Sequence, residues 1–224
     1  MRVISFNANG LRSATRKGFF SWFSRQRADV LCVQELKAQA AQLQESAYHQ
    51  KGFHRTLFEA RRPGYSGVAI YSRSRPKKII KGLGKEEFDA EGRYLEAIFE
   101  NVAVVSVYLP SGSSGEIRQQ AKFRFLDFFE KHLVKLRRRR LPYILCGDFN
   151  DTPLSYAYNT IINDLNDSFS ESGKGIGRSF VRIPALRIDY ILHDKKFSSF
   201  NYKQHKPKQE LSDHYAISTE LSIP

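Results

Sequence analysis

The chain has 224 residues, with 36 Lys and Arg against 23 Asp and Glu and a net charge of +13. This length suits a single domain over residues 1–224, because one core can grow to this size without splitting. Two cysteines in apolar runs exclude a disulfide framework, and no window approaches the ~20 apolar residues of a membrane span, so we expect a cytoplasmic monomer without membrane contact.

The positive charge is concentrated in the first two thirds of the chain. Residues 1–150 hold 27 Lys and Arg against 14 Asp and Glu, whereas residues 151–224 hold nine of each. A surface this basic usually meets a polyanion, and the alternative is that the charge merely keeps the protein soluble.

Eight short runs have the pattern of β-strands, either apolar on both faces or alternating with period two. In chain order they are Arg2–Phe6, Val30–Gln34, Gly67–Ser72, Tyr94–Phe99, Val102–Tyr108, Tyr143–Cys146, Ile188–Leu192 and Tyr215–Leu221.

Two segments between these runs show helical spacing, Lys17–Arg27 and Ile117–Arg138. The second ends in Arg137–Arg140, where cations favour the negative end of the helix dipole; contact with phosphate is the alternative role. Strands outnumber helices and often follow one another directly, so the pattern predicts a layered α/β domain.

Polar residues follow or precede the predicted strands repeatedly. Singly, each is best explained as a cap or turn residue, since Asn and Asp favour turns. Their coincidence at strand ends instead predicts a ligand site, because a sheet presents side chains there. The set comprises Asn7, Asn9, Glu35, Tyr108, Asp148, Asn150, Asp213 and His214.

The residue types indicate metal-assisted activation of water. Mg²⁺ takes oxygen ligands and needs only one or two carboxylates, and Glu35 is the first choice among them. No Cys/His cluster has zinc spacing, so Mg²⁺ is preferred, with Mn²⁺ as a substitute. Asp148 suits the base that accepts a proton from water, and Asn150, His214 and Tyr108 suit contacts to a phosphate.

The same residues lie in motifs that closely resemble exonuclease III and the related abasic-site endonucleases, within the endonuclease/exonuclease/phosphatase superfamily. The resemblance covers nearly the whole chain in order. It rests on Met1-Arg-Val-Ile-Ser-Phe-Asn-Ala-Asn-Gly-Leu-Arg, Val33-Gln-Glu-Leu-Lys37, Gly64-Tyr-Ser-Gly-Val-Ala69, Glu91-Gly-Arg93, Tyr108-Leu-Pro, Gly147-Asp-Phe-Asn150, Arg187-Ile-Asp-Tyr190 and Ser212-Asp-His214.

The resemblance implies a four-layered α/β sandwich, with two facing central β-sheets flanked by helices and the active site at one edge. It places Glu35, Asn7 and Asp213 around the metal. It makes Asp148, Asn150, His214, Tyr108 and Asp189 catalytic, with Asp189 orienting His214, although a strand-edge ion pair with an Arg is the alternative for Asp189. It also puts four residues near the DNA: Arg93, Arg187, Lys37 and Asn9.

The chain departs from this pattern between Asn150 and Arg187, where it is much shorter than typical abasic-site endonucleases. Leu186 stands where those enzymes commonly carry Trp, and residues 151–158 and 171–180 look like another, poorly assigned bacterial branch of the superfamily. The charge step at the same place suggests a hypothesis: the chain joins parts of two branches near residue 150, by engineering or recombination. Natural relatives with both halves contiguous would contradict it.

The sequence therefore predicts a Mg²⁺-dependent DNA phosphodiesterase of base excision repair. The expected activities are abasic-site incision, 3′ to 5′ exonuclease action, or both, on duplex DNA with abasic sites or damaged 3′ ends. Two alternatives stay open: hydrolysis of a smaller phosphoester, and DNA binding with little turnover. Replacing Asp148 by Asn separates them, because it abolishes turnover but leaves simple DNA binding nearly unchanged.

Overall fold

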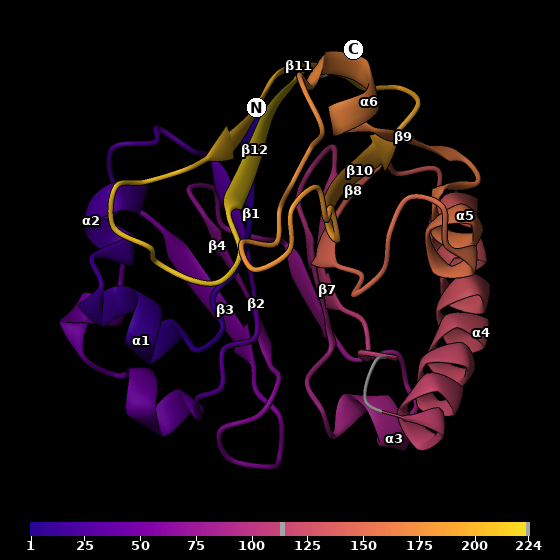
Figure 1. Cartoon of the computed structure of the whole chain (residues 1–224), viewed down its shortest axis with the longest axis horizontal. Helices are drawn as coiled ribbons and strands as arrows, with labels where there is room; N and C mark the ends of the chain where they lie inside the picture. The colour runs from indigo at the N-terminus through magenta and orange to yellow at the C-terminus, as the bar shows by residue number, and fades with distance from the viewer. Residues whose placement is uncertain (113–114, 223–224) are drawn as a thin grey trace.

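The strands form two six-stranded sheets that face each other, as the computed structural model describes for residues 1–112 and 115–222 (Figure 1). The first sheet has the order β11-β12-β1-β2-β4-β3. Its strands are β1 (Arg2–Asn7), β2 (Val30–Gln34), β3 (His54–Phe58), β4 (Val68–Ser72), β11 (Ser198–His205) and β12 (Ala216–Ser222).

The second sheet repeats the pattern of the first. Its order is β5-β6-β7-β8-β10-β9, and in each sheet one central parallel pair is flanked by antiparallel strands, β1 with β2 and β7 with β8. Its strands are β5 (Lys78–Lys81), β6 (Tyr94–Ile98), β7 (Ala103–Tyr108), β8 (Tyr143–Asp148), β9 (Leu165–Asp167) and β10 (Asp189–Asp194).

Helices cover the outer faces of the two sheets and complete four layers (Figure 1). The long amphipathic α4 buries Phe125, Phe129 and Leu133 against the second sheet, and Phe19 and Phe23 of α2 pack on the first. A third core lies between the sheets. The helices are α1 (Leu11–Arg16), α2 (Phe19–Phe23), α3 (Glu86–Asp89), α4 (Glu116–Arg138), α5 (Tyr156–Ile162) and α6 (Ser168–Ser172), with 3₁₀ turns η1 (Ala40–Leu43) and η2 (Ser46–Tyr48). The predicted fold class is confirmed.

The four strands that the sequence pattern missed are the four edge strands β3, β5, β9 and β11. An edge strand is covered less than a central one and needs no continuous apolar run. In β5, both end residues are exposed, whereas all five residues of β2 are buried. The pattern therefore identified every strand with two neighbours.

In each sheet, the strands that follow residue 150 form an adjacent pair at one edge, β11-β12 in the first sheet and β10-β9 in the second. β12 pairs with β1, and β10 pairs with β8 over five register positions. The C-terminal part thus completes both sheets, and the proposed junction near residue 150 stays a hypothesis. Within the described ranges, no helix combines the length and apolar character needed to cross a membrane.

Candidate active site

The carboxyl ends of the two central strand pairs meet at one edge of the sandwich. Tyr108 and Asp148 are register partners at the ends of β7 and β8, and Asn7 ends β1. At this edge Asn7 Nδ2 donates to Asp148 Oδ2 at 2.8 Å, and the Tyr108 hydroxyl donates to Glu35 Oε1 at 2.5 Å, so each bond joins one sheet to the other. Four residues predicted from separate motifs therefore lie in direct contact.

A buried polar network directly below these residues fixes how the sheets align. Gln34 Nε2 donates to Ser106 Oγ at 3.1 Å, and Ser106 Oγ donates to the Val33 carbonyl at 3.2 Å. Gln34 and Ser106 are fully buried. Because a buried polar group without a partner is costly, these bonds disfavour any sliding of one sheet over the other and hold the site residues in register.

The loops at this edge have unusual backbone conformations. Asn9 (φ 42°), Glu35 (φ 53°), Lys37 (φ 46°) and Asn150 (φ 50°) all adopt positive φ. A non-glycine residue in this region costs on the order of 1–3 kcal/mol and persists only where surrounding contacts impose it. For Asn9 that contact is a hydrogen bond from its N–H to Asn7 Oδ1 at 2.9 Å.

Asp148 lies at the centre of the polar side chains gathered at this edge. Besides Asn7, the Asn150 N–H donates to its Oδ1 at 2.7 Å, and His214 Nε2 lies 4.0 Å from its Oδ2. Burial raises the pKa of Asp148 most, and the charge of Asp189 adds to it, while His214, Asn150 and Asn7 lower it; the net result is a pKa of about 7. A carboxylate so poised accepts a proton readily near neutral pH.

His214 lies between two carboxylates. Its Nδ1 is 2.8 Å from Asp189 Oδ2, and only 7% of the residue is exposed. Burial lowers the pKa of His214, but Asp189, Asp148 and Asp213 outweigh it and raise the pKa to about 10. The imidazole is therefore a cation near neutral pH, with an orientation set by Asp189.

Asp189 pairs with this histidine and not with an arginine. It is 2% exposed and is the register partner of Asp148 across β8 and β10. Within the residues that the structure describes, its second oxygen, Oδ1, is buried without a hydrogen-bond partner. The ion pair with His214 thus engages one of the two carboxylate oxygens.

Glu35, Lys37 and Asn9 form the more open side of the site. Lys37 Nζ lies 3.4 Å from Glu35 Oε2 and donates to Asn9 Oδ1 at 2.5 Å. Asp213, predicted with Glu35 as a metal ligand, is half-buried, and its Oδ1 accepts a hydrogen bond from Ser212 Oγ at 3.2 Å. These oxygen atoms are of the type that a hard divalent cation takes.

Among the described residues, one group of three acidic or histidine side chains could hold a metal: Asp148, Asp189 and His214, whose ligand atoms lie within 4.8 Å of one another. A protonated imidazole has no free lone pair for a metal, and His214 Nδ1 already pairs with Asp189. The group therefore suits an ion-pair cluster better than a zinc centre. The carboxylates and the Asn oxygens fit a hard cation.

Of the two arginines predicted near DNA, Arg93 adjoins the site, although it is 2% exposed and forms an ion pair with Glu91 at 2.5 Å. Its Nη1 donates to the Tyr108 carbonyl at 3.0 Å, its Nη2 donates to the Tyr65 hydroxyl at 2.9 Å, and its guanidinium lies 4.9 Å from the centroid of the Tyr108 ring. Arg118 also donates to the Tyr65 hydroxyl, at 3.1 Å. Sequence reasoning gave Tyr65 no role, although it stands in the Gly64-Tyr-Ser-Gly motif.

Arg187 has a structural environment. It is 7% exposed, its Nη1 donates to Asp167 Oδ2 at 2.5 Å, and its guanidinium stacks on Phe169 and Tyr190 at 4.7 and 4.8 Å from the ring centroids. The structure does not bring this side chain to the surface. The physical reason is that Asp167 of β9 supplies an anion and Phe169 of α6 and Tyr190 of β10 supply ring faces that cover most of the guanidinium.

The two facing sheets, with a buried carboxylate–imidazole cluster at one edge, place the protein in the class of α/β sandwiches. A family model described as the Endonuclease/Exonuclease/phosphatase family matches residues 4–214, and the chain belongs to this family. The chain is 39% identical to an exodeoxyribonuclease of Bacillus subtilis over 153 residues, 67% of this chain and 58% of the relative. It is 32% identical to the DNA repair nuclease APEX1 of Danio rerio over 152 residues, 67% of this chain and 49% of the relative.

The chain thus spans about half the length of these curated relatives. Solved structures resemble all of it: an AP endonuclease from Archaeoglobus fulgidus has a TM-score of 0.87 at 24% identity and covers 100% of both chains. The 3′-5′ exonuclease NExo from Neisseria meningitidis has a TM-score of 0.82 at 22% identity, covering 98% of this chain and 99% of that one. At these identities the likeness shows the fold, and the resemblance to the exonuclease III side of the family is confirmed by the sequence relatives.

Proposed function

We propose that the protein is a Mg²⁺-dependent DNA phosphodiesterase that incises abasic sites, removes nucleotides from 3′ ends, or does both. The observation that carries this proposal is the placement of Asp148. Its buried carboxylate, with a pKa of about 7, lies between the amide of Asn7 and the imidazole of His214. That arrangement supplies a base and a neighbouring cation at one point, as hydrolysis of a phosphodiester requires.

Each neighbouring side chain has a role in this chemistry. Asp148 accepts the proton of the attacking water. The Asn150 N–H and the Asn7 amide each donate to one oxygen of this carboxylate and hold it in place. The His214 cation, fixed by Asp189, stabilises the negative charge that grows on a phosphoryl oxygen. The Tyr108 hydroxyl would donate to a phosphoryl oxygen once it leaves Glu35 Oε1.

The metal ion belongs with the oxygen atoms on the Glu35 side of the site. Glu35, Asn7 and Asp213 would hold it, as predicted, and Mn²⁺ would substitute for Mg²⁺. When bound, the ion polarises the phosphate and neutralises charge on its oxygens. When no ion is bound, Lys37 supplies a positive charge at this place, with its Nζ 3.4 Å from Glu35 Oε2.

Duplex DNA is the proposed partner. The net charge of +13 provides general affinity for a phosphate backbone that should weaken steeply with salt. The relatives named above include an exodeoxyribonuclease and a DNA repair nuclease, and a related Neisseria structure is described as a 3′ phosphatase bound to a product DNA hairpin. These names support DNA over a smaller phosphoester.

The test is cleavage of a labelled duplex that carries one abasic-site analogue. An undamaged duplex with a recessed 3′ end and a small chromogenic phosphodiester run beside it, each with Mg²⁺ and with EDTA. Metal-dependent incision at the lesion or shortening from the 3′ end supports the proposal. Cleavage of the small ester alone, or DNA binding without any cleavage, contradicts it.

A further inference from the structure

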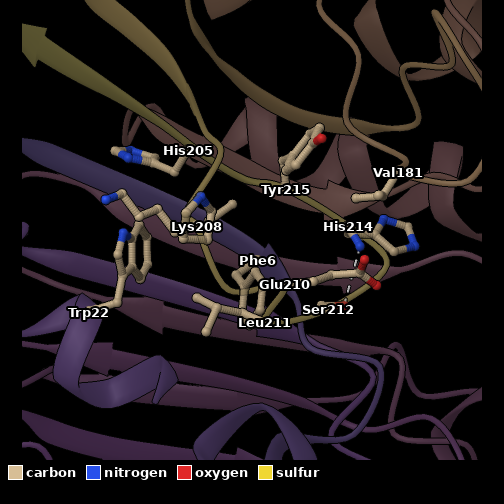
Figure 2. A pocket seen from close by; sticks show the side chains of 12 residues that line it. Phe6, Trp22, Val181, His205, Lys208, Glu210, Leu211, Ser212, His214 and Tyr215 are labelled. Atoms are coloured by element: carbon tan, nitrogen blue, oxygen red, sulfur yellow. Dashed lines mark hydrogen bonds between the residues drawn. The ribbon is translucent and has the colours of Figure 1, made fainter. Parts of the chain in front are cut away.

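A pocket of about 200 Å³ adjoins the catalytic cluster at His214 and is not used by the mechanism above. Figure 2 shows Trp22 and His205 at one end and His214 at the other. The loop between β11 and β12, which carries Lys208 and Glu210, borders it. His214 lines the pocket and belongs to the catalytic cluster, so the pocket borders one of the residues proposed to contact the phosphate.

The aromatic side chains of the pocket wall pack against neighbouring rings. Phe6 is stacked on Phe19 with ring centroids 4.4 Å apart, and Trp22 lies edge-on to His205 at 5.0 Å. His205 Nε2 is 2.8 Å from Ser218 Oγ, and burial, together with Arg2 and Lys203, lowers its pKa to about 4. The imidazole is therefore neutral and belongs to the ring surface. It does not act as a cation.

The polar groups of the pocket carry opposite charges. Lys208 is exposed, and Glu210 forms an ion pair with Arg182 at 2.9 Å. A planar group with apolar faces and a hydrogen-bonding edge matches the lining, because its faces fit the aromatic rings and its edge fits the charged side chains.

We propose that this pocket binds the base of an unpaired nucleotide next to the scissile phosphate. The inference rests on the proposed function and adds a specificity element to it. A volume below the ~300 Å³ typical of sites for drug-sized ligands suits a single base. Stacking of a base on an aromatic side chain contributes on the order of 1–3 kcal/mol whatever its sequence, which gives a preference for unstacked ends without sequence specificity.

The first test uses the fact that Trp22 is the one tryptophan of the chain. Its emission is recorded while the protein is titrated with dAMP, with deoxyribose 5-phosphate and with inorganic phosphate. We expect a saturable change with dAMP and none with the other two. A response of equal size to inorganic phosphate, or no response to dAMP, overturns the assignment to a base.

The second test measures DNA binding without turnover. In the Asp148→Asn background, Trp22→Leu removes the ring and Trp22→Phe keeps one, and far-UV dichroism checks that each variant folds. Fluorescence anisotropy then gives the Kd for a labelled duplex with an unpaired 3′ nucleotide and for the same duplex with an abasic residue there.

We expect Trp22→Leu to raise the Kd on the order of tenfold for the base-bearing duplex and less than about twofold for the abasic one, with Trp22→Phe near the parent. Equal effects on both duplexes overturn the proposal. Because neither test needs cleavage, a protein that binds the base but cleaves nothing would contradict the proposed function and leave this inference standing.

Discussion

The two ends of the sandwich are built by the same strands but hold their charges differently. At the end where β1, β2, β7 and β8 terminate, Asp148, Asp189 and His214 are buried together. At the opposite end, Lys77 and Glu100 form an ion pair with side chains 60% and 69% exposed. The hollow there, which these two residues help to line, has a volume of about 390 Å³, yet it contains no comparable cluster.

This difference shows that the size of a hollow is a poor guide to the reactive end of this molecule. The two ends are about 17 Å apart along β8, from Tyr143 to Asp148 at ~3.3 Å per residue. An exposed pair is hydrated and screened, so its charges gain little mutual energy. Water does not hydrate or screen charges that are buried together. Such charges therefore shift one another's pKa values toward the values that a catalyst needs.

The largest predicted effect is at Asp148. Asp148→Asn removes the base but keeps the size of the side chain, so the cleavage rate should fall on the order of 10²–10⁴-fold. Single-turnover rates on the abasic duplex measure this, and the Kd for the same duplex should change less than about threefold. Residual activity near that of the parent would place the base elsewhere.

Loss of the oxygen ligand at Glu35 should come next. Glu35→Gln keeps an acceptor for the Tyr108 hydroxyl but removes a negative charge, so the Mg²⁺ concentration for half-maximal rate should rise on the order of 100-fold. A titration of rate against Mg²⁺ measures the shift, and EDTA should abolish cleavage by the parent. An unchanged Mg²⁺ requirement would remove Glu35 from the metal site.

Asp189 tests whether one carboxylate orients the cation. Asp189→Asn leaves a hydrogen-bond acceptor near His214 Nδ1 but no charge, so the rate should fall on the order of 10–100-fold. The NMR titration of the imidazole supplies the decisive readout, because the pKa of His214 should move down with the loss of its main anion. A slower enzyme with an unchanged imidazole pKa would mean that Asp189 acts only through folding.

Most of the fold and the site were predictable because they depend on buried strands and their ends. Central strands such as β2 are apolar throughout, and a polar residue that follows such a run stands out. The contact between Asn7 and Asp148, 141 residues apart, follows only once both sheets are assembled. The resemblance to a known family therefore predicted which strand ends meet at the site, and the local sequence pattern did not.

Arg187 and Trp22 show what the sequence could not give. Arginine and tryptophan both occur in protein cores and in binding sites. The role of each residue here depends on neighbours that are distant in sequence. Asp167 and the rings around it bury Arg187, whereas Trp22 stays half-buried because the β11–β12 loop leaves a pocket over it. No spacing rule distinguishes these outcomes, because each is set by how a loop covers a sheet face.

The cluster should also give the rate a characteristic pH dependence. Asp148 must be unprotonated to act as a base, so the rate should rise about tenfold per pH unit up to a pKa of about 7. His214 must stay protonated, so the rate should fall above about pH 10. These apparent values belong to the coupled cluster, and kcat/KM against pH at constant ionic strength measures them. A flat profile from pH 5.5 to 8 would contradict the role of Asp148.

The smallest predicted effect is at the opposite end. Lys77→Ala removes one partner of the exposed pair with Glu100, which should cost less than about 1 kcal/mol of unfolding free energy because solvent screens both charges. Cleavage of the abasic duplex should be unchanged at moderate salt, since the pair lies far from Asp148. Thermal melting and the single-turnover assay check both values. If instead this change reduced cleavage more than about tenfold, with the melting temperature intact, the opposite end would itself contact DNA, and the separation between a reactive end and an inert end would fail.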